Sequence, residues 1–386
     1  MNYTQKKIEN HVRKIRKEIG HEDSEINIKN IIFNENISEN KNTKNISNNR
    51  NDNSELWIIT KDRSDKSIII GKGGWVVGRL KEELGIGKIH VESYSDYILK
   101  KYKMELSLDK VNSFIRDQKE IAIKEGLEWN SDKSNGLINL KNLLEEKINN
   151  IYNFDFNKFI NNLEISEFNK ENKHQCIVAL SGGVDSSFSL IIAKYLNFNP
   201  IAITVDPGTI ILPKQFKNNI NKLCNKLNVK HKFIKVDYSD VIDGSLSKGK
   251  FHPCGQCSSK TGETLFKYGL DNKIPIVIFG DMLSTGSQCI TKNRTFDTEN
   301  NVKNLYRLNL PATLAISKQE IKQVTSNYDL TKIGGFGCPL LFEVHKKYPY
   351  MRKFSIQRIL RETRSGALEP GEALDLIWSF NKVKHY

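Results

Sequence analysis

One segment of this 386-residue chain combines glycines, hydroxyls and a carboxylate at close spacing: Ser181-Gly182-Gly183-Val184-Asp185-Ser186-Ser187. Glycines let an anion approach the backbone, and the free N–H groups and the dipole of a following helix bind it. Three serine hydroxyls add donors. The segment therefore predicts a phosphate-binding loop; the alternative is an ordinary turn in which Asp185 caps a helix.

Three cysteines form a second candidate site. Cys254 and Cys257 stand two residues apart, within reach of one metal centre, and Cys338 follows 81 residues later in a glycine-rich turn. The thiols are candidate ligands of a metal or of an iron–sulfur cluster. Three alternatives stay open: a zinc site with His252 or Cys289 as fourth ligand, a persulfide carrier with a resolving thiol, and thiols that are incidental.

A glycine-rich turn, Gly71-Lys72-Gly73-Gly74, lies between two helical patterns and is flanked by strand candidates at 56–60 and 89–94. Glycine lets the backbone approach nucleic-acid phosphates, because it has no side chain to block contact. Lys72 in the turn, with Arg79 and Lys81 on the next helix, would add positive charge. The alternative is a domain of this shape that serves only for packing.

The sequence on either side of the loop predicts the strands and the helix that would position it. Residues 176–180 form a continuous apolar run, typical of a strand buried on both faces of a parallel sheet, and helical periodicity follows the loop. Two further strands, 200–206 and 274–279, end at Asp206 and at Gly280-Asp281. The carboxyl ends of parallel strands share one edge of the sheet, so these residues are predicted to line the same ligand crevice.

The loop lacks the lysine of P-loop NTPases and closely resembles the SGGxDS signature of the PP-loop ATP pyrophosphatases. That resemblance implies an α/β, doubly wound, parallel-sheet domain that splits ATP between its α- and β-phosphates and adenylates a carbonyl oxygen. Asp185 would help position Mg²⁺ and pyrophosphate. ATP-binding candidates are Ser181, Gly182, Gly183, Asp185, Ser186, Ser187, Asp206, Gly280 and Asp281. Arg307 and the segment 317–321 resemble a late segment of the same family.

The cysteine pattern after such a loop resembles the iron–sulfur 2-thiouridine synthases that act on tRNA. The resemblance implies that Cys254, Cys257 and Cys338 hold a [4Fe–4S] cluster whose fourth iron is open to carry sulfur. Asp185, Cys254 and Cys338 would then be catalytic. The zinc-binding ribbons that such synthases often carry at their ends are absent from this sequence.

The strand–helix–GxxG–helix–strand order resembles a KH domain, which implies RNA binding by Gly71, Lys72, Gly73, Gly74, Arg79 and Lys81. We expect a small α+β KH-like domain, a helical connector and a catalytic domain. The predicted boundaries are a helical segment at 1–33, an Asn-rich flexible insertion at 34–54, the KH-like domain at 55–96, the connector at 97–170 and the PP-loop domain at 171–386.

Lys and Arg exceed Asp and Glu by 59 − 45 = 14, which favours a polyanionic partner, although a Lys- and Asn-rich sequence could carry the same surplus at exposed positions. The basic segment 352–364 suits contact with an RNA backbone or a solvated surface. The N-terminus lacks the apolar region of a secretory signal, and no apolar run is long enough to span a membrane. A cytoplasmic location follows as an expectation.

The sequence thus predicts ATP-dependent modification of RNA, with tRNA as the expected substrate, by adenylation of a base carbonyl and sulfur transfer. ATP, Mg²⁺ and a [4Fe–4S] cluster (alternatively Zn²⁺) are the expected cofactors, and a sulfur donor is an expected partner. Two alternatives stay open. One is a PP-loop enzyme that adenylates a small molecule for amine or sulfur transfer, and the other a non-catalytic RNA-binding protein regulated by ATP. The oligomeric state also stays open, a homodimer included.

Overall fold

The computed structural model describes residues 3–35, 54–124, 126, 129, 135–152, 154–162, 175–296, 302–330 and 336–381. The chain divides into two compact units, Met1–Lys101 and Tyr102–Tyr386. The division falls within one long helix, α4 (Tyr94–Lys124). No helix among the described residues is long and apolar enough to cross a membrane.

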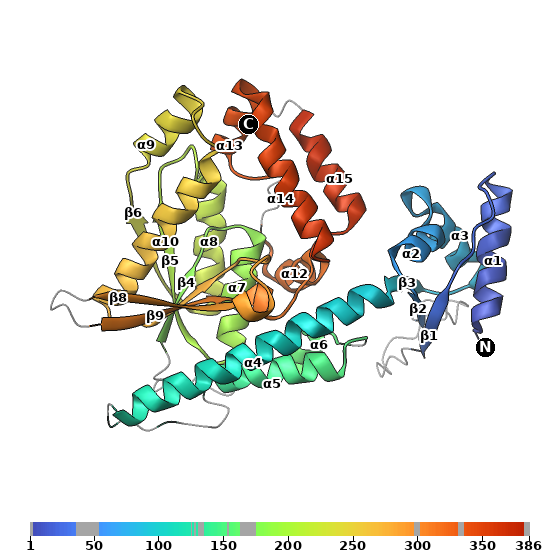
Figure 1. Cartoon of the computed structure of the whole chain (residues 1–386), viewed down its shortest axis with the longest axis horizontal. Coiled ribbons are helices and arrows are strands. Elements are labelled where there is room, and N and C mark those ends of the chain that lie inside the picture. Colours follow the sequence, from blue (N-terminus) through green and yellow to red (C-terminus); the bar gives the residue numbers. More distant parts are fainter. Residues whose placement is uncertain are drawn as a thin grey trace, which may run out of the picture. The chain divides into compact units, whose positions relative to one another are not determined.

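The first unit packs helices on one face of a three-stranded sheet of order β1-β2-β3 (Figure 1). Its elements, besides the start of α4, are α1 (Gln5–Glu18), β1 (Ile28–Glu35), β2 (Ser54–Thr60), α2 (Arg63–Ile70), α3 (Trp75–Leu84) and β3 (Lys88–Ser93). Strand β2 pairs antiparallel with β1 and parallel with β3. Buried Leu56 and Ile58 of β2 share a core with Ile8 and Val12 of α1.

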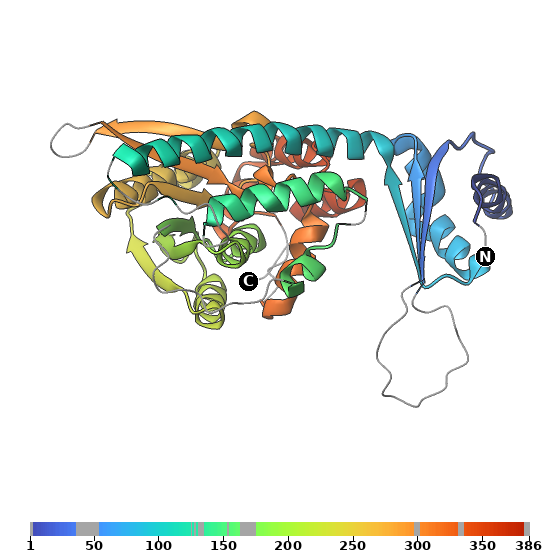
Figure 2. The same cartoon turned by 90° about the horizontal axis from the view of Figure 1, so that it is seen from below.

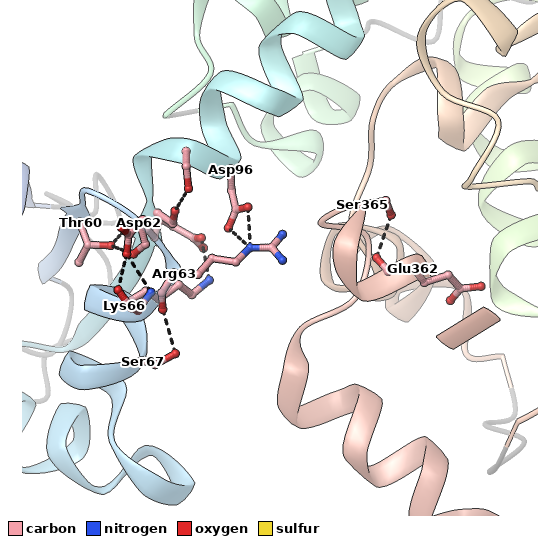
Figure 3. Close-up of polar contacts among 12 residues, drawn as sticks. Thr60, Asp62, Arg63, Lys66, Ser67, Asp96, Glu362 and Ser365 are labelled. Carbon is pink, nitrogen blue, oxygen red and sulfur yellow. Dashed lines mark hydrogen bonds and ion pairs between the residues drawn. The ribbon is translucent and has the colours of Figure 1, made fainter. Parts of the chain in front are cut away.

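Local capping fixes the helix of the first unit that precedes the glycine turn. The Asp62 carboxylate accepts hydrogen bonds from the backbone N–H of Ser64 (2.9 Å) and Asp65 (3.4 Å), which satisfies free donors at the start of α2. Arg63 pairs with both carboxylate oxygens of Asp96 at 2.7 and 3.0 Å (Figure 3). The start of α4 is therefore tied to the start of α2 within this unit.

Strand β1 corrects the predicted boundaries. Residues 1–33 were expected to be helical, but only α1 is, and Ile28–Glu35 forms an edge strand. Its Ile-Ile-Phe run supplies β-forming residues, while Asn30 and Asn34 obscure the pattern. Most of the predicted flexible insertion lies outside the described residues; its ends, Asn34, Glu35 and Ser54, belong to strands β1 and β2. The strand, helix, turn, helix and strand expected between 55 and 95 all form.

The second unit is an α/β, doubly wound domain around a six-stranded sheet of order β6-β5-β4-β7-β9-β8 (Figures 1 and 2). All its strand pairs are parallel except β8 with β9. Its strands are β4 (Gln175–Ala179), β5 (Asn199–Asp206), β6 (Lys230–Lys235), β7 (Ile276–Phe279), β8 (Ile290–Phe296) and β9 (Val302–Asn309).

The helices of the second unit, besides α4, are α5 (Gly136–Asn149), α6 (Phe156–Asn162), α7 (Val184–Tyr195), α8 (Lys214–Leu227), α9 (Ser239–Ile242), α10 (Pro253–Asp271), α11 (Leu310–Thr313), α12 (Lys318–Thr325), α13 (Pro339–Lys347), α14 (Arg352–Arg364) and α15 (Pro370–Trp378). The expected helical connector is thus α4, α5 and α6. Helix α14 ends where the Ser365 hydroxyl donates to the Glu362 carbonyl at 2.8 Å (Figure 3).

Helices cover both faces of this sheet. Ile177, Val277 and Phe279 face one way and pack with Leu265 of α10. Val178 and Ile278 face the other way, into a larger core that includes residues of α4, α5, α7 and α8. Side chains alternate along a strand, so a strand covered on both faces must be apolar throughout. This requirement explains the uninterrupted apolar run that predicted β4.

Candidate functional site

The serine–glycine loop lies at the point where the strand order of the sheet reverses. From β4 the chain adds β5 and β6 on one side, then returns to add β7 and β9 on the other. In open parallel sheets, ligands bind outside the carboxyl ends of the strands at such a switch point. Residues 180–183 connect β4 to α7 there, so the predicted phosphate-binding loop has the position that the fold reserves for a ligand.

The loop is held in shape by its own serines. The Ser186 hydroxyl accepts a hydrogen bond from the Ser181 backbone N–H at 3.1 Å and donates to the Gly183 carbonyl at 3.0 Å; its oxygen also lies 3.0 Å from the Ser181 hydroxyl. Gly182 adopts φ +79°, and a Cβ there would come within 2.7 Å of the Phe216 carbonyl. Ser186 therefore serves the loop itself, and Ser187 is buried at 1 % exposure.

Asp185 has one carboxylate oxygen in a contact within the chain and one without a partner. Its Oδ2 atom pairs with Lys318 Nζ at 2.5 Å. Its Oδ1 atom is shielded from solvent and has no hydrogen-bond partner among the described residues. A buried polar atom without a partner costs about 1–3 kcal/mol, and such atoms are rare in folded proteins. An oxygen of this kind in an anion-binding loop fits Mg²⁺, which prefers oxygen ligands.

Lys318 is a site residue that the sequence placed only in a family-like segment. It begins α12, whose N-terminus is fixed by a capping box between Ser317 and Glu320. Glu320 also pairs at 3.0 Å with Lys147 of α5, which is 2 % exposed and donates to the Leu314 carbonyl. Lys147 of α5 thus stabilises the start of α12, and α12 in turn places the Lys318 ammonium beside Asp185. The sequence spacing of these residues predicts neither contact.

The other predicted ATP-binding residues, Gly280, Asp281 and Asp206, differ in the contacts that they make. A Cβ on Gly280 would come within 2.8 Å of the Ser186 nitrogen, so glycine lets the end of β7 touch the loop. Asp281 accepts from the backbone N–H of Leu283 and Ser284, and its Oδ2 lies 3.8 Å from Arg307 Nη2. Gly280 thus lies against the loop, and Asp281 follows it directly after β7.

Asp206, by contrast, has a local structural task. Its carboxylate accepts from the Gly208 N–H at 3.1 Å and from Lys217 Nζ at 2.6 Å. Burial opposes its ionisation, but these donors outweigh burial, and the pKa of Asp206 is lowered. Both oxygens accept hydrogen bonds within the chain, so the carboxylate shapes the turn after β5. The part of Asp206 in ATP binding stays a prediction.

The three predicted cysteines lie at helix starts. Cys254 and Cys257 occupy the first two turns of α10, and Cys338 caps the N-terminus of α13. Burial raises the pKa of Cys254 to about 11, and the neighbouring Cys338 adds to the rise. Burial likewise raises the pKa of Cys257 to about 12, with contributions from Cys338 and Cys254. The thiols therefore lie close enough to influence one another.

These thiols are not arranged as a ligand set. Across the part of the chain that the structure describes, no group of three or more His, Cys, Asp or Glu side chains is placed to hold a metal ion. Cys254 and Cys257 lie in α10, while Cys338 is at the N-terminus of α13. Their spacing in sequence therefore could not show how closely Cys338 approaches the other two. The arrangement does not fit the predicted cluster, or a zinc ion, as it stands.

Arg358 of α14 interacts electrostatically with both Cys254 and Asp281. Its guanidinium opposes the rise in the pKa of Cys254. Burial alone would lower the pKa of Arg358, but the charges of Glu362, Cys254 and Asp281 outweigh burial and raise it. One cation thus influences both sites; the sequence showed it only as part of a basic helix.

In the first unit, the structure gives a backbone reason for the glycines of the turn. Gly71, Gly73 and Gly74 all have φ between +65° and +79°, a region that disfavours other residues. Lys72 and Lys81 are exposed. Arg79 lies 3.6 Å from Glu82 and 3.9 Å from Glu18, which offset its charge. Trp75, 60 % exposed at the start of α3, is a neighbour that the prediction overlooked.

Comparison with solved structures finds weak similarity, at 16 % sequence identity in each case. The U34-tRNA thiolase NcsA from Methanococcus maripaludis, solved with its [4Fe-4S] cluster, aligns with TM-score 0.33 over 54 % of this chain and 71 % of its own. NMN synthetase from Francisella tularensis aligns with TM-score 0.33 over 60 % and 95 %. NH3-dependent NAD synthetase from Campylobacter jejuni subsp. jejuni aligns with TM-score 0.30 over 59 % and 94 %. Alignments of this quality assign neither activity nor substrate.

Sequence comparison identifies relatives in Methanocaldococcus jannaschii, while no protein-family model matches. The uncharacterized protein MJ1599 is 23 % identical over 208 residues, which cover 52 % of this chain and 71 % of that protein. The uncharacterized protein MJ1638 is 32 % identical over 209 residues, which cover 54 % of this chain and 75 % of that protein. The chain belongs to the same protein family as MJ1638.

Proposed function

We propose that this protein is an ATP-dependent RNA-modifying enzyme, with tRNA as its expected substrate, that adenylates a base carbonyl and replaces its oxygen with sulfur. The observation that carries the proposal is the buried, unpartnered Oδ1 atom of Asp185 within a serine–glycine loop at the switch point of the sheet. The PP-loop signature supports ATP as the ligand, and the net charge of +14 supports a polyanionic substrate.

The loop residues would hold the pyrophosphate part of ATP. Free N–H groups at the start of α7 and the helix dipole favour its negative charge, and Lys318 adds a cation from α12. Mg²⁺, held by Asp185 Oδ1, would supply Lewis-acid stabilisation of the phosphate oxygens. In the adenylation step, the base carbonyl oxygen attacks the α-phosphorus and the bond to pyrophosphate breaks.

The second step replaces the activated oxygen. A sulfide-class nucleophile adds to the carbon, and AMP leaves with the original oxygen, so no electrons are gained or lost. Cys254, Cys257 and Cys338 are the candidate residues for delivering that sulfur. If it comes from a persulfide on one of these thiols, the outer sulfur adds to the carbon, and a second thiol then attacks the sulfur–sulfur bond, which releases the product and leaves a disulfide. Arg358 is the candidate cation for stabilising the departing AMP, because its charge acts on both Cys254 and Asp281.

A second candidate function is adenylation of a small carboxylate or carbonyl compound, followed by amine transfer. It is favoured by the absence, among the described residues, of three thiols arranged as a ligand set. It needs the same loop and no sulfur chemistry. Iron and acid-labile sulfide, measured after anaerobic purification of the wild type and of Cys254→Ala, separate the two candidates. Cluster chemistry requires about four irons per chain that the substitution removes.

The proposal is tested first at Asp185. Binding of a fluorescent ATP analogue is measured with and without Mg²⁺, and pyrophosphate release is measured after RNA is added. Asp185→Ala should abolish the Mg²⁺ dependence of binding and slow pyrophosphate release about a hundredfold or more, because a preorganised electrostatic contact is lost. Affinity for RNA should not change.

Asp271→Ala, at the exposed end of α10, is the matched control and should behave as the wild type. An Asp185→Ala protein that releases pyrophosphate at the wild-type rate would contradict the proposal. ATP-dependent RNA binding with no pyrophosphate release from any tested RNA would favour the non-catalytic alternative.

A further inference from the structure

Two tyrosines between α13 and α14 are held by hydrogen bonds from their hydroxyl groups. Tyr348 donates to the Ser247 carbonyl and Tyr350 to the Gly249 carbonyl, both at 2.9 Å. Lys347 Nζ also donates to the Ser247 carbonyl, at 3.3 Å. Gly249 has φ +62°, and a Cβ there would come within 2.7 Å of the Tyr348 ring. The loop at 247–249 thus fixes both rings.

The three rings differ in exposure. Tyr350 is 58 % exposed and Phe354, in the first turn of α14, is 43 % exposed, while Tyr348 is half-buried. Lys347 Nζ lies 5.4 Å from the centre of the Tyr348 ring and Lys353 Nζ lies 5.1 Å from that of Phe354. We call Tyr348, Tyr350 and Phe354 the aromatic platform. The hydrogen bonds restrain the rings of Tyr348 and Tyr350, so a flat ligand could stack on the exposed Tyr350 ring at a small cost in side-chain entropy.

The surroundings of the aromatic platform are strongly basic. Between His345 and Arg364 the chain carries seven Lys and Arg residues and one acidic residue, Glu362, which is buried and paired with Arg358. Positive charge at this surface is therefore largely uncompensated within the segment. Lys346, Lys347 and Lys353 are exposed and adjoin the rings in sequence, and exposed Lys250 follows the loop that holds the two tyrosines.

Flat aromatic faces among cations fit a ligand with both flat rings and a polyanionic backbone. Base stacking on aromatic side chains with phosphates on Lys and Arg is the usual mode of single-stranded nucleic-acid binding. A duplex offers phosphates but hides its base faces in the stack, and an acidic peptide offers charge without flat rings. The combination favours unpaired RNA over both.

We propose that the aromatic platform and its lysines bind a single-stranded segment of the substrate RNA. This inference rests on the proposed function and specifies its substrate as RNA unpaired at the site of docking. The platform also adjoins the thiols: the Phe354 ring lies 5.7 Å from the ring of His252, which caps α10 two residues before Cys254.

The test measures binding of a fluorescein-labelled, mixed-sequence 12-nucleotide RNA to the full-length protein without ATP, by fluorescence anisotropy. The same sequence as a duplex and a labelled polyglutamate peptide are the comparison probes. The double variant Tyr350→Ala/Phe354→Ala should weaken binding of the single strand about tenfold or more, because base stacking is lost. Its binding of the duplex should stay within about twofold of the wild type.

The charge component is tested with Lys347→Ala/Lys353→Ala. Loss of two phosphate contacts should lower the slope of log affinity against log salt by about 1.4 for a single strand. Lys230→Ala/Lys267→Ala, two exposed lysines on β6 and α10, is the matched control for charge and should keep its slope. Leu374→Ala/Trp378→Ala, at 57 % and 64 % exposure on α15, is the matched control for exposed apolar surface.

Two results would overturn the inference. One is a single-strand affinity that both platform variants leave unchanged, which would point to a binding surface elsewhere, such as the glycine turn of the first unit. The other is tighter binding of duplex or polyglutamate than of the single strand. Neither result touches ATP adenylation, which is measured separately by Asp185→Ala and pyrophosphate release, so the two failures can be told apart.

Discussion

The phosphate loop and the cysteine site both lie at helix N-termini, yet they differ in how complete they are. Around the loop, Ser186 satisfies the backbone, Lys318 supplies a cation, and a single oxygen of Asp185 is left for a ligand. The thiols are instead half-buried, and burial raises the pKa of Cys254 to about 11, well above neutral pH. A thiolate is the nucleophile and the metal ligand, so a thiol needs a partner before it can react.

The two sites therefore depend on the fold in different ways. The loop is formed by contacts within the chain and should bind without rearrangement. The cysteine site depends on something that stabilises negative charge on sulfur, whether a metal or a closer approach of Arg358. Substitutions that affect one site and leave the other unchanged test this difference between the loop and the cysteine site.

The largest effect on stability is expected from Lys147→Met, which acts on the helix that carries Lys318 to the loop. The substitution removes a buried cation and leaves Glu320 and the Leu314 carbonyl without it, which costs about 3–5 kcal/mol in the free energy of unfolding. Because Glu320 caps α12, amide hydrogens of Lys318–Thr325 should exchange much faster. Hydrogen exchange by mass spectrometry measures both the local and the global change. Unaltered protection of α12 would disprove the bracing role of α5.

A smaller loss in the free energy of unfolding is expected near the cysteines when the pH is lowered. Burial, His252 and Arg352 lower the pKa of His345 to about 4. In the unfolded chain this histidine has a pKa of about 6.5, so its contribution to stability is fully present above pH 6.5 and is lost as pH falls toward 4. The loss amounts to about 2–3 kcal/mol, and His345→Gln should flatten it.

Urea unfolding of the wild type and of His345→Gln, measured from pH 7 to pH 4, checks this expectation. His345 belongs to α13, which Cys338 caps, so the acid sensitivity should appear around the thiols and not in the loop. Equal slopes of stability against pH in the two proteins would show that His345 is not the responsible group.

Gly280→Ala should perturb the loop by packing alone. The new methyl group would lie 2.8 Å from the Ser186 nitrogen and 2.9 Å from the Asp185 carbonyl carbon, both backbone atoms that cannot move aside easily. Such overpacking costs about 1–3 kcal/mol. Affinity for the fluorescent ATP analogue should fall, and calorimetry should show a lower melting temperature. Wild-type ATP affinity would mean that the loop is more adaptable than its contacts suggest.

The smallest effect is expected from the matching substitution at the cysteines, Gly255→Ala. No atom outside its own helix and chain neighbours lies within 4 Å of the new methyl group, and Gly255 has helical surroundings in α10. Alanine should stabilise the helix by about 0.5–1 kcal/mol. A rise of a degree or two in melting temperature is the expected result. A loss of stability would indicate that this helix start is more crowded than the loop comparison implies.

Much of the fold could be predicted because its signals are local. The apolar run of β4 and the glycines and serines after it identify strand, loop and helix within about 20 residues. Edge strands gave weaker signals: Asn30 and Asn34 obscured β1, and β8 was not expected. The predicted domain boundary at 96/97 falls inside α4, where the sequence has no Gly or Pro to interrupt the helix.

The candidate site could be predicted only as far as its residues are neighbours in sequence. Contacts between Lys318 and Asp185, 133 residues apart, and between Lys147 and Glu320 depend on how helices cross the sheet. The same holds for Cys338, whose approach to Cys254 joins two helices. The contact between Asp206 and Lys217 on the next helix was not predicted for a related reason.

The Ser355 hydroxyl lies between two imidazoles, 3.2 Å from His252 Nε2 and 3.1 Å from His345 Nε2. A hydroxyl has one proton to donate, so when it donates to one ring, the other ring must carry hydrogen on its own Nε2 and donate back. In that arrangement the two neutral histidines hold opposite tautomers. If Nε2 of His252, two residues before Cys254, is the acceptor, then Nε2 of His345, 93 residues further along the chain, must carry hydrogen.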